Sequence, residues 1–217
     1  MDAGTALGVI AIVIAVIVPF IAERLKRRAL DIEIVEEQSS SGIPYRHLHA
    51  RVINRPHRVV KWAERNPAVD SRVVMTFYDS GGRKLFDPLE AKWDDGPQPL
   101  APAVQLVANP AQLSISQSVV TLFNDAMIPF AHRIVIPPSI DGKSFAVVIK
   151  HQGQDECYAF NGWSYAFGSR WSNPAWQIGK GEFRVEMRVT SGSMSKLRSF
   201  VLKNDGPNLT DISLTDV

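Results

Sequence analysis

Cysteine is almost absent from this sequence, since Cys157 is the single one among 217 residues. One cysteine excludes an intramolecular disulfide and a cysteine-rich zinc site. An excess of charge is also lacking, because 24 Lys and Arg residues stand against 22 Asp and Glu residues, for a formal charge of +2. So small an excess gives no electrostatic case for a nucleic-acid partner. Charged residues at 21% and hydrophobic residues at 45% exclude a disordered chain and a polytopic membrane protein.

The sequence also lacks the motifs of common enzyme classes. It contains no GxSxG nucleophile elbow, no HExxH, no P-loop, no GxGxxG fingerprint and no EF-hand loop. Cys157 follows Asp155 and Glu156, whose charges would raise the pKa of a nearby thiol. We therefore expect a buried structural cysteine, no enzymatic activity and no cofactor.

What the sequence does contain is one long uncharged run near its N-terminus. Residues 3–22 read AGTALGVIAIVIAVIVPFIA, and eleven of these twenty are Leu, Ile, Val or Phe. At ~1.5 Å per residue, a helix of this length spans ~30 Å, the hydrocarbon thickness of a bilayer. We predict a transmembrane helix over residues 1–22, followed by a basic juxtamembrane segment over residues 23–30. A cleavable secretory signal is the alternative, but the run has no basic n-region and no cleavage motif follows it.

Basic residues follow the run and none precedes it. The predicted membrane flank contains Arg24, Lys26, Arg27 and Arg28. The positive-inside rule then places the C-terminal bulk in the cytoplasm, as a single-pass protein of the cell membrane. These residues either fix the topology only, as a stop-transfer flank, or also contact anionic headgroups. Gly4 and Gly8 form a GxxxG pair through which two copies could associate as a homodimer.

After Leu30 the hydrophobic period changes from helical to alternating. In residues 45–54, Leu48, Ala50 and Val52 alternate with polar residues, as in a strand with one solvated face. A short helix is expected at residues 59–66. The further strands that we expect cover residues 31–34, 72–79, 103–107, 119–123, 132–136, 144–150, 183–190 and 196–203. Many short strands with turn residues between them indicate an all-β, antiparallel sandwich over residues 31–217.

The C-terminal strands carry a resemblance. The segment 181–189, GEFRVEMRV, resembles the penultimate strand of many immunoglobulin-like sandwiches, where a glycine and an aromatic residue open an alternating strand. A hairpin partner at residues 196–203 would complete the sheet. Taken whole, the chain resembles uncharacterised prokaryotic single-pass membrane-anchored proteins with an immunoglobulin-like β-sandwich domain. The resemblance implies this fold and no particular activity.

An aromatic-rich loop, residues 158–176, is the best candidate for a binding site. The ligand-binding residues that we predict in it are Asn161, Trp163, Tyr165, Arg170, Trp171, Asn173 and Trp176. Exposed rings beside amide and guanidinium groups can stack on a sugar or hold a peptide. The alternative is a loop whose rings pack on one another as a satellite core.

Two polar groups are weaker candidates. His47 and His49 share a strand face with Arg51, and His57 follows. A histidine pair at i, i+2 can chelate zinc, but Arg51 would repel a cation, so we expect a solvated strand face and no metal. The neighbouring acids Asp94-Asp95 are typical of a turn, where aspartate bonds to the local backbone.

The pattern as a whole predicts a membrane-anchored, non-enzymatic binding or scaffolding module. Its partners would be the lipid bilayer and another protein or a small ligand, with no nucleic acid. The alternative is a surface-facing carbohydrate-binding domain that uses the aromatic-rich loop 158–176.

Overall fold

The computed structural model describes residues 3–35, 43–56, 65–96, 132–165 and 171–217, and the side chains of the N-terminal helix from Ile14 onward. Several predicted features lie outside the described residues: the strands at 103–107 and 119–123, most of the helix at 59–66, His57 and Arg170.

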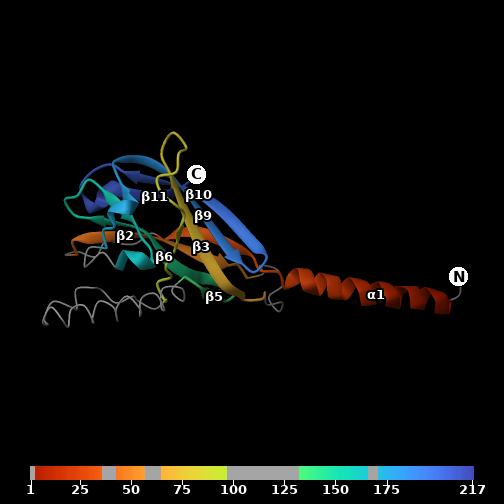
Figure 1. Ribbon diagram of the computed structural model, residues 1–217. Helices are drawn as coiled ribbons and strands as arrows, with labels where there is room; N and C mark the ends of the chain where they lie inside the picture. The colour runs from red at the N-terminus through yellow and green to blue at the C-terminus, as the bar shows by residue number, and fades with distance from the viewer. Residues whose placement is uncertain (1–2, 36–42, 57–64, 97–131, 166–170) are drawn as a thin grey trace, which may run out of the picture.

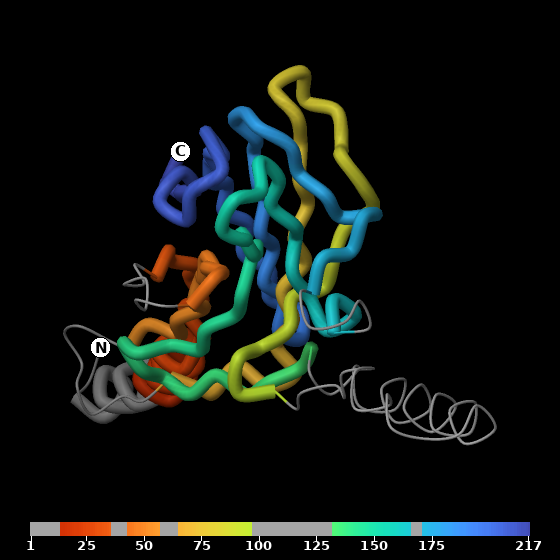
Figure 2. Tube along the Cα trace, turned by 90° about the vertical axis from the view of Figure 1, so that its left-hand side faces the viewer, coloured from red at the N-terminus to blue at the C-terminus, as the bar shows by residue number. Residues whose placement is uncertain are grey.

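The described head is built from antiparallel strands arranged in two sheets (Figures 1 and 2). The five-stranded sheet has the order β1(Leu30–Val35), β2(Tyr45–Asn54), β6(Ser139–His151), β7(Cys157–Ala159), β8(Gln177–Ile178). The other sheet has the order β11(Ile212–Asp216), β10(Met194–Asn204), β9(Gly181–Ser191), β3(Ala68–Tyr78), β4(Leu89–Glu90), and β5(Ile134–Ile136) pairs with β3. The predicted all-β, antiparallel class is confirmed. The finer immunoglobulin-like assignment is not confirmed.

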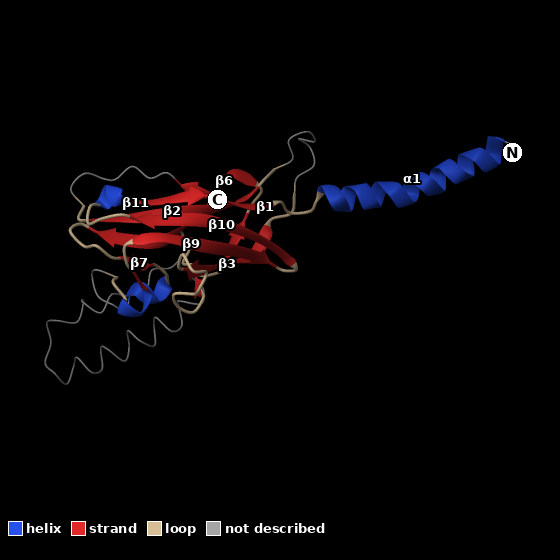
Figure 3. Ribbon diagram, turned by 90° about the horizontal axis from the view of Figure 1, so that it is seen from above, coloured by secondary structure: helices blue, strands red, loops and turns tan. Residues whose placement is uncertain are grey.

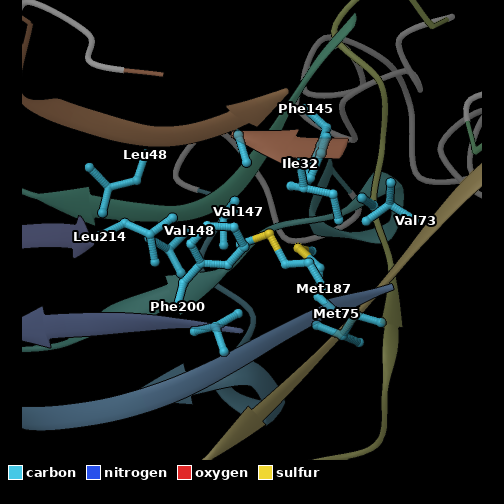
Figure 4. Packing of buried hydrophobic residues seen from close by; sticks show 14 of the residues in the cluster. Ile32, Leu48, Val73, Met75, Phe145, Val147, Val148, Met187, Phe200 and Leu214 are labelled. Atoms are coloured by element: carbon cyan, nitrogen blue, oxygen red, sulfur yellow. The ribbon is translucent and has the colours of Figure 1, made fainter. Parts of the chain in front are cut away.

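The two sheets contribute to one hydrophobic core. Ile32 and Phe145 come from the five-stranded sheet, and both are fully buried. Met75, Met187 and Phe200 come from the other sheet and lie in the same cluster (Figure 4). Each fully buried side chain of this size contributes about 1.5–3 kcal/mol relative to an exposed one, so this shared interior holds the sheets face to face.

Local alternation explains the C-terminal hairpin. Val185, Met187 and Val189 of β9 are fully buried, and the residues between them point outward. β9 pairs with β10 from Met194↔Ser191 to Asn204↔Gly181. The turn contains Gly192 at φ 59°, a left-handed conformation that glycine adopts without steric cost. The predicted strands 183–190 and 196–203 and the turn between them are confirmed.

A β-bulge decides which side chains face out of the five-stranded sheet. The register of β2 against β6 shifts between Leu48, which pairs with Val148, and His49, which pairs with Ala146. Val147 is the extra residue, a geometry that breaks the two-residue period of the strand. Ala146 and Ile149 therefore belong to a small cluster separate from the main core, to which Val147 and Val148 belong.

The helix α1(Ala3–Leu25) projects away from the sheets, with its N-terminus far from them (Figures 1 and 3). Its side chains from Ile14 to Ile21 are exposed, among them Ile14 at 55% and Phe20 at 60%. Over the described residues, no helix is both long and apolar enough to cross a membrane. The transmembrane helix predicted for residues 1–22 is therefore not confirmed by the structure and stays a prediction.

Candidate functional site

A hollow on the outer face of the five-stranded sheet joins the two candidate groups. We call it the outer hollow; its volume is about 190 Å³. It is lined by His47, His49, Lys92, Asp94, Ala146, Phe160, Tyr165 and Trp171. Sites for drug-sized ligands are typically about 300–1,000 Å³, so the outer hollow fits a smaller group. The histidine face of β2 and the aromatic-rich loop, which are far apart in the sequence, thus form one site.

Strand geometry supplies the floor of the outer hollow. Leu48 and Ala50 are buried in the main core, so the alternating residues His47 and His49 point to the other side of β2. On the neighbouring strand, Ala146 faces the same side because of the bulge at Val147.

Aromatic rings form the wall. The ring of Phe160 lies 4.9 Å from that of His47 at an interplanar angle of 83°, and the ring of Trp171 lies 5.9 Å from His47. Tyr165 lies 5.7 Å from Phe160 and 6.0 Å from Trp171. The contacts of Phe160 with His47 and with Tyr165 are edge contacts, which are favourable because the positive ring edge meets the negative face of its neighbour. Phe160, Tyr165 and Trp171 therefore pack as the satellite core that is the alternative interpretation of this loop.

Asn161 and Asn173 hold the loop in shape. The Asn161 Oδ1 accepts hydrogen bonds from the backbone N–H of Trp163 at 2.9 Å and of Ser164 at 3.2 Å. The Asn173 Oδ1 accepts from the N–H of Ala175 at 2.9 Å, at the start of the 3-10 helix η3(Pro174–Trp176). Both asparagines are buried, and their described side-chain hydrogen bonds are to backbone N–H groups of the loop.

The three loop tryptophans have different surroundings. Trp163 is 42% exposed, whereas Trp176 packs against the main core. Trp171 is partly buried in the wall of the outer hollow and has φ 52°. The left-handed region costs roughly 1–2 kcal/mol for a residue with a Cβ, and such strain is common at functional sites. Of the predicted ligand-binding residues that are described, Tyr165 and Trp171 line the outer hollow.

The sequence did not indicate Lys92 and indicated Asp94 only as a turn residue, but both come from the segment after β4 and line the outer hollow. Trp93 between them is fully buried and donates from Nε1 to the carbonyl oxygen of His132 at 3.0 Å. The Asp94 N–H donates to the carbonyl oxygen of Ser144 on β6 at 2.9 Å. Lys92 is itself buried, whereas Asp94 is exposed. The alternation of a core-facing tryptophan between two charged residues is the signal that could have indicated them, but it is too short to stand out in the sequence.

Three titratable side chains of the outer hollow, His47, Lys92 and Tyr165, have shifted pKa values. Burial, and next the neighbouring His49, lower the pKa of His47 to about 4, so its imidazole is neutral at pH 7. Burial lowers the pKa of Lys92, against the opposing effect of Asp94 and Asp95. The Lys92 Nζ lies 5.7 Å from the ring centroid of Tyr165. Burial raises the pKa of the Tyr165 hydroxyl.

These groups offer polar contacts inside an aromatic wall. The buried Nδ1 of His47 has no hydrogen-bond partner within the described ranges. The Nε2 of His49 lies 3.5 Å from Oδ1 of Asp94. An unpaired ring nitrogen, a carboxylate and an ammonium group beside aromatic rings are suited to a small planar polar group. Over the parts of the chain that are described, no three His, Cys, Asp or Glu side chains form a metal-binding group.

Cys157 lies away from this site, in the main core. Burial raises the pKa of its thiol to about 12, against the opposing effect of Lys150. The expectation of a buried structural cysteine is confirmed.

Comparison of the chain with protein-family models, with curated proteins and with solved structures found no match. The resemblance to membrane-anchored proteins with an immunoglobulin-like domain is therefore neither supported nor contradicted by a relative.

Proposed function

We propose that this chain is a membrane-anchored, non-enzymatic binding module whose ligand site is the outer hollow. In this proposal the N-terminal helix spans the cell membrane once, the basic flank stays on the cytoplasmic side, and the head is an immunoglobulin-like sandwich in the cytoplasm. The observation that carries the ligand site is the convergence of His47, Phe160 and Trp171 from separate elements around one hollow.

The anchor is supported by composition and by exposure. Residues 3–22 contain no charge. The described part of α1 presents large apolar side chains, such as Val16 at 67% and Phe20 at 60% exposure, on a helix that projects from the head. Exposed apolar surface of this kind is typical of a contact with a membrane or another protein.

The ligand class follows from the lining of the outer hollow. Its rings favour a planar group, and the neutral imidazole of His47 offers a hydrogen bond to it. The small volume favours a side chain of a partner protein or a small molecule of similar size. If the partner protein is attached to the same membrane, its effective concentration near the outer hollow is high, because anchoring holds both proteins at one surface.

A second candidate is the carbohydrate-binding domain that uses loop 158–176. The exposed indole of Trp163 favours it, since a free aromatic face can stack on a sugar ring. This candidate places the ligand on Trp163, outside the outer hollow, and the head on the external side of the membrane.

One pair of variants separates the two candidates. Ligand-observed NMR of the full chain in detergent micelles would measure binding of benzamide, as a planar amide, and of N-acetylglucosamine. We expect benzamide to bind and Trp171→Ala to abolish this binding, while Trp163→Ala leaves it unchanged. Binding of the sugar that is lost in Trp163→Ala would support the carbohydrate candidate instead. Equal benzamide binding by both variants and the wild type would contradict the outer hollow as the site.

Anchoring and orientation need a separate test. The full chain should float with phosphatidylcholine vesicles and resist extraction by carbonate. A Ser80→Cys variant places a thiol in an exposed turn. We expect a membrane-impermeant maleimide to label this variant only after lysis, with the wild type and its buried Cys157 as the control. Labelling in intact cells would contradict the cytoplasmic head.

A further inference from the structure

A second hollow lies where α1 meets the head. Its volume is about 450 Å³, and we call it the juxtamembrane hollow. It is lined by Glu23, Lys26, Arg27, Arg28, Asn66, Ser193 and Met194. The lining comes from three separate parts of the chain: the end of α1, the segment before β3, and the turn between β9 and β10, which points toward α1 (Figure 1).

Hydrogen bonds hold these parts together. The Asn66 N–H donates to the carbonyl oxygen of Lys26 at 3.0 Å, and Arg65 Nη1 donates to the carbonyl oxygen of Arg27 at 2.6 Å. Arg28 Nη1 donates to the carbonyl oxygen and to the Oγ of Ser191, at 3.1 and 3.2 Å. These hydrogen bonds hold residues 26–28 against the head, so that the basic segment and the head together form a concave surface.

The juxtamembrane hollow is cationic. Lys26 and Arg27 are exposed, and within the described residues neither forms an ion pair. Among the described residues, the hydrogen-bond acceptors of the Arg28 side chain are two neutral oxygens of Ser191. In the described part of the lining Glu23 is the one carboxylate, so three cationic side chains face one acid there. Ammonium and guanidinium groups in this arrangement are suited to a phosphate, which accepts charge-assisted hydrogen bonds from both.

Apolar side chains flank the cations at the same end of the head. Val69 is 45% exposed, and its carbonyl oxygen accepts a hydrogen bond from the Oγ of Ser191 at 2.6 Å. Val135, on β5 beside the start of β3, is 51% exposed. Exposed apolar groups next to cations match a lipid interface, where acyl chains and headgroups meet.

We propose that the juxtamembrane hollow binds the phosphate of an anionic phospholipid headgroup. This inference rests on the proposed anchoring, because a helix that crosses the bilayer places its end at headgroup level. A flank that only fixes the topology needs its charges near the membrane but no concave surface. The juxtamembrane hollow is instead lined by three cationic side chains together with Asn66 and Ser193. The side chains of Asn66 and Ser193 can donate further hydrogen bonds to a phosphate.

The test measures which lipid the full chain retains. The protein is equilibrated in detergent micelles with equal amounts of phosphatidylglycerol and phosphatidylcholine, and native mass spectrometry counts the bound lipids. We expect a preference for phosphatidylglycerol. The double variant Lys26→Gln/Arg27→Gln should reduce this preference by up to about fivefold for each charge removed.

A matched control separates a site from general charge. Arg83→Gln/Lys84→Gln removes two adjacent cations from an exposed turn elsewhere on the head, and it should keep the preference. The charge-conserving variant Lys26→Arg/Arg27→Lys should also keep it. Equal retention of both lipids by the wild type, or an equal loss in the control variant, would contradict the proposal.

Two further measurements distinguish lipid from free phosphate as the ligand, and the headgroup site from the membrane anchor. Excess inorganic phosphate should not displace phosphatidylglycerol, and complete displacement would assign the juxtamembrane hollow to free phosphate instead of lipid. Flotation with phosphatidylcholine vesicles reports on anchoring alone. A chain that floats but shows no lipid preference would contradict the headgroup site and leave anchoring intact, whereas a chain that does not float would contradict both.

Discussion

The imidazole of His47 stands almost perpendicular to the ring of Phe160, with their centroids 4.9 Å apart. This contact joins β2 to the segment that follows β7, which is far from it in the sequence. Because Phe160 covers a strand face that would otherwise be solvated, His47 loses water and its pKa falls to about 4. The same contact therefore forms the wall of the outer hollow and sets the charge inside it.

The stability of the head should fall at mildly acidic pH. The pKa of His47 is about 4 in the folded chain against 6.5 for an unperturbed histidine, so the unfolded chain takes up the proton first. Above pH 6.5 the imidazole is neutral in the folded and the unfolded chain, and it does not reduce the free energy of unfolding. As the pH falls from 6.5 toward 4, protonation of the unfolded chain lowers the free energy of unfolding by up to about 3 kcal/mol. Urea unfolding of the full chain in micelles, followed by tryptophan fluorescence, measures this slope.

His47→Gln is the control for this pH dependence. It should flatten the slope between the two pKa values, although not completely, because burial also lowers the pKa of His132. An unchanged slope in His47→Gln would contradict the assignment to His47.

The buried pair of Lys150 and Asn204 should be sensitive to the loss of one partner. Lys150 is fully buried, and its Nζ donates to Asn204 Oδ1 at 2.7 Å and to the carbonyl oxygen of Asp155 at 3.0 Å. Asn204→Ala would leave a buried amine with one acceptor fewer and should destabilise the fold by roughly 3 kcal/mol. Lys150→Met, which removes the amine but keeps most of the volume, should cost less. Equilibrium unfolding measures the loss of stability in each variant. A larger loss in Lys150→Met than in Asn204→Ala would contradict the assignment of the Lys150 amine to a buried site without water.

Gly142 should tolerate no side chain. It has φ 66°, and a Cβ at this position would lie 2.6 Å from the carbonyl oxygen of Val52. Gly153 has φ 81° but open space around it, so it serves as the matched control. Gly153→Ala should cost only the backbone strain of about 1–2 kcal/mol, and Gly142→Ala should cost clearly more because the β2–β6 pairing must also open. Equal losses in thermal unfolding would mean that β2 and β6 are not this close.

Cys157 should not react in the folded chain. It is buried, and its pKa of about 12 leaves almost no thiolate at neutral pH. We expect no reaction with Ellman's reagent under native conditions and one thiol per chain in denaturant. Rapid labelling of the native protein would contradict the packing of β7 against the core.

Much of the fold could be predicted because strand formation leaves a local trace. Residues 45–54 alternate cleanly, and the observed β2 has these same bounds. The hairpin of β9 and β10 was likewise visible as two alternating runs around Gly192. In each case neighbouring residues alone report which face is buried, since side chains of a strand alternate.

The outer hollow could be predicted only in pieces. Tyr165 and Trp171 were among the predicted ligand-binding residues, and they line it. Asn161 and Asn173 belong to the same loop, but they cap its turns because their side chains bond to nearby backbone groups. The alternation around Lys92 and Asp94 is too short to stand out in the sequence, and it is the pairing of Trp93 with Phe145 that places them beside the histidines.

The sequence by itself determined the antiparallel all-β class, the turn at Gly192 and the buried state expected of Cys157. It also determined the cluster of basic residues after an uncharged run. Each of these features depends on residues that are close together in the chain. Only the tertiary structure decided that the bulge at Val147 turns Lys150 inward, and that the aromatic-rich loop folds onto the histidine face of β2. The physical reason is that local periodicity says which side of a strand is buried but not against what, since that choice depends on how distant segments fill one common interior.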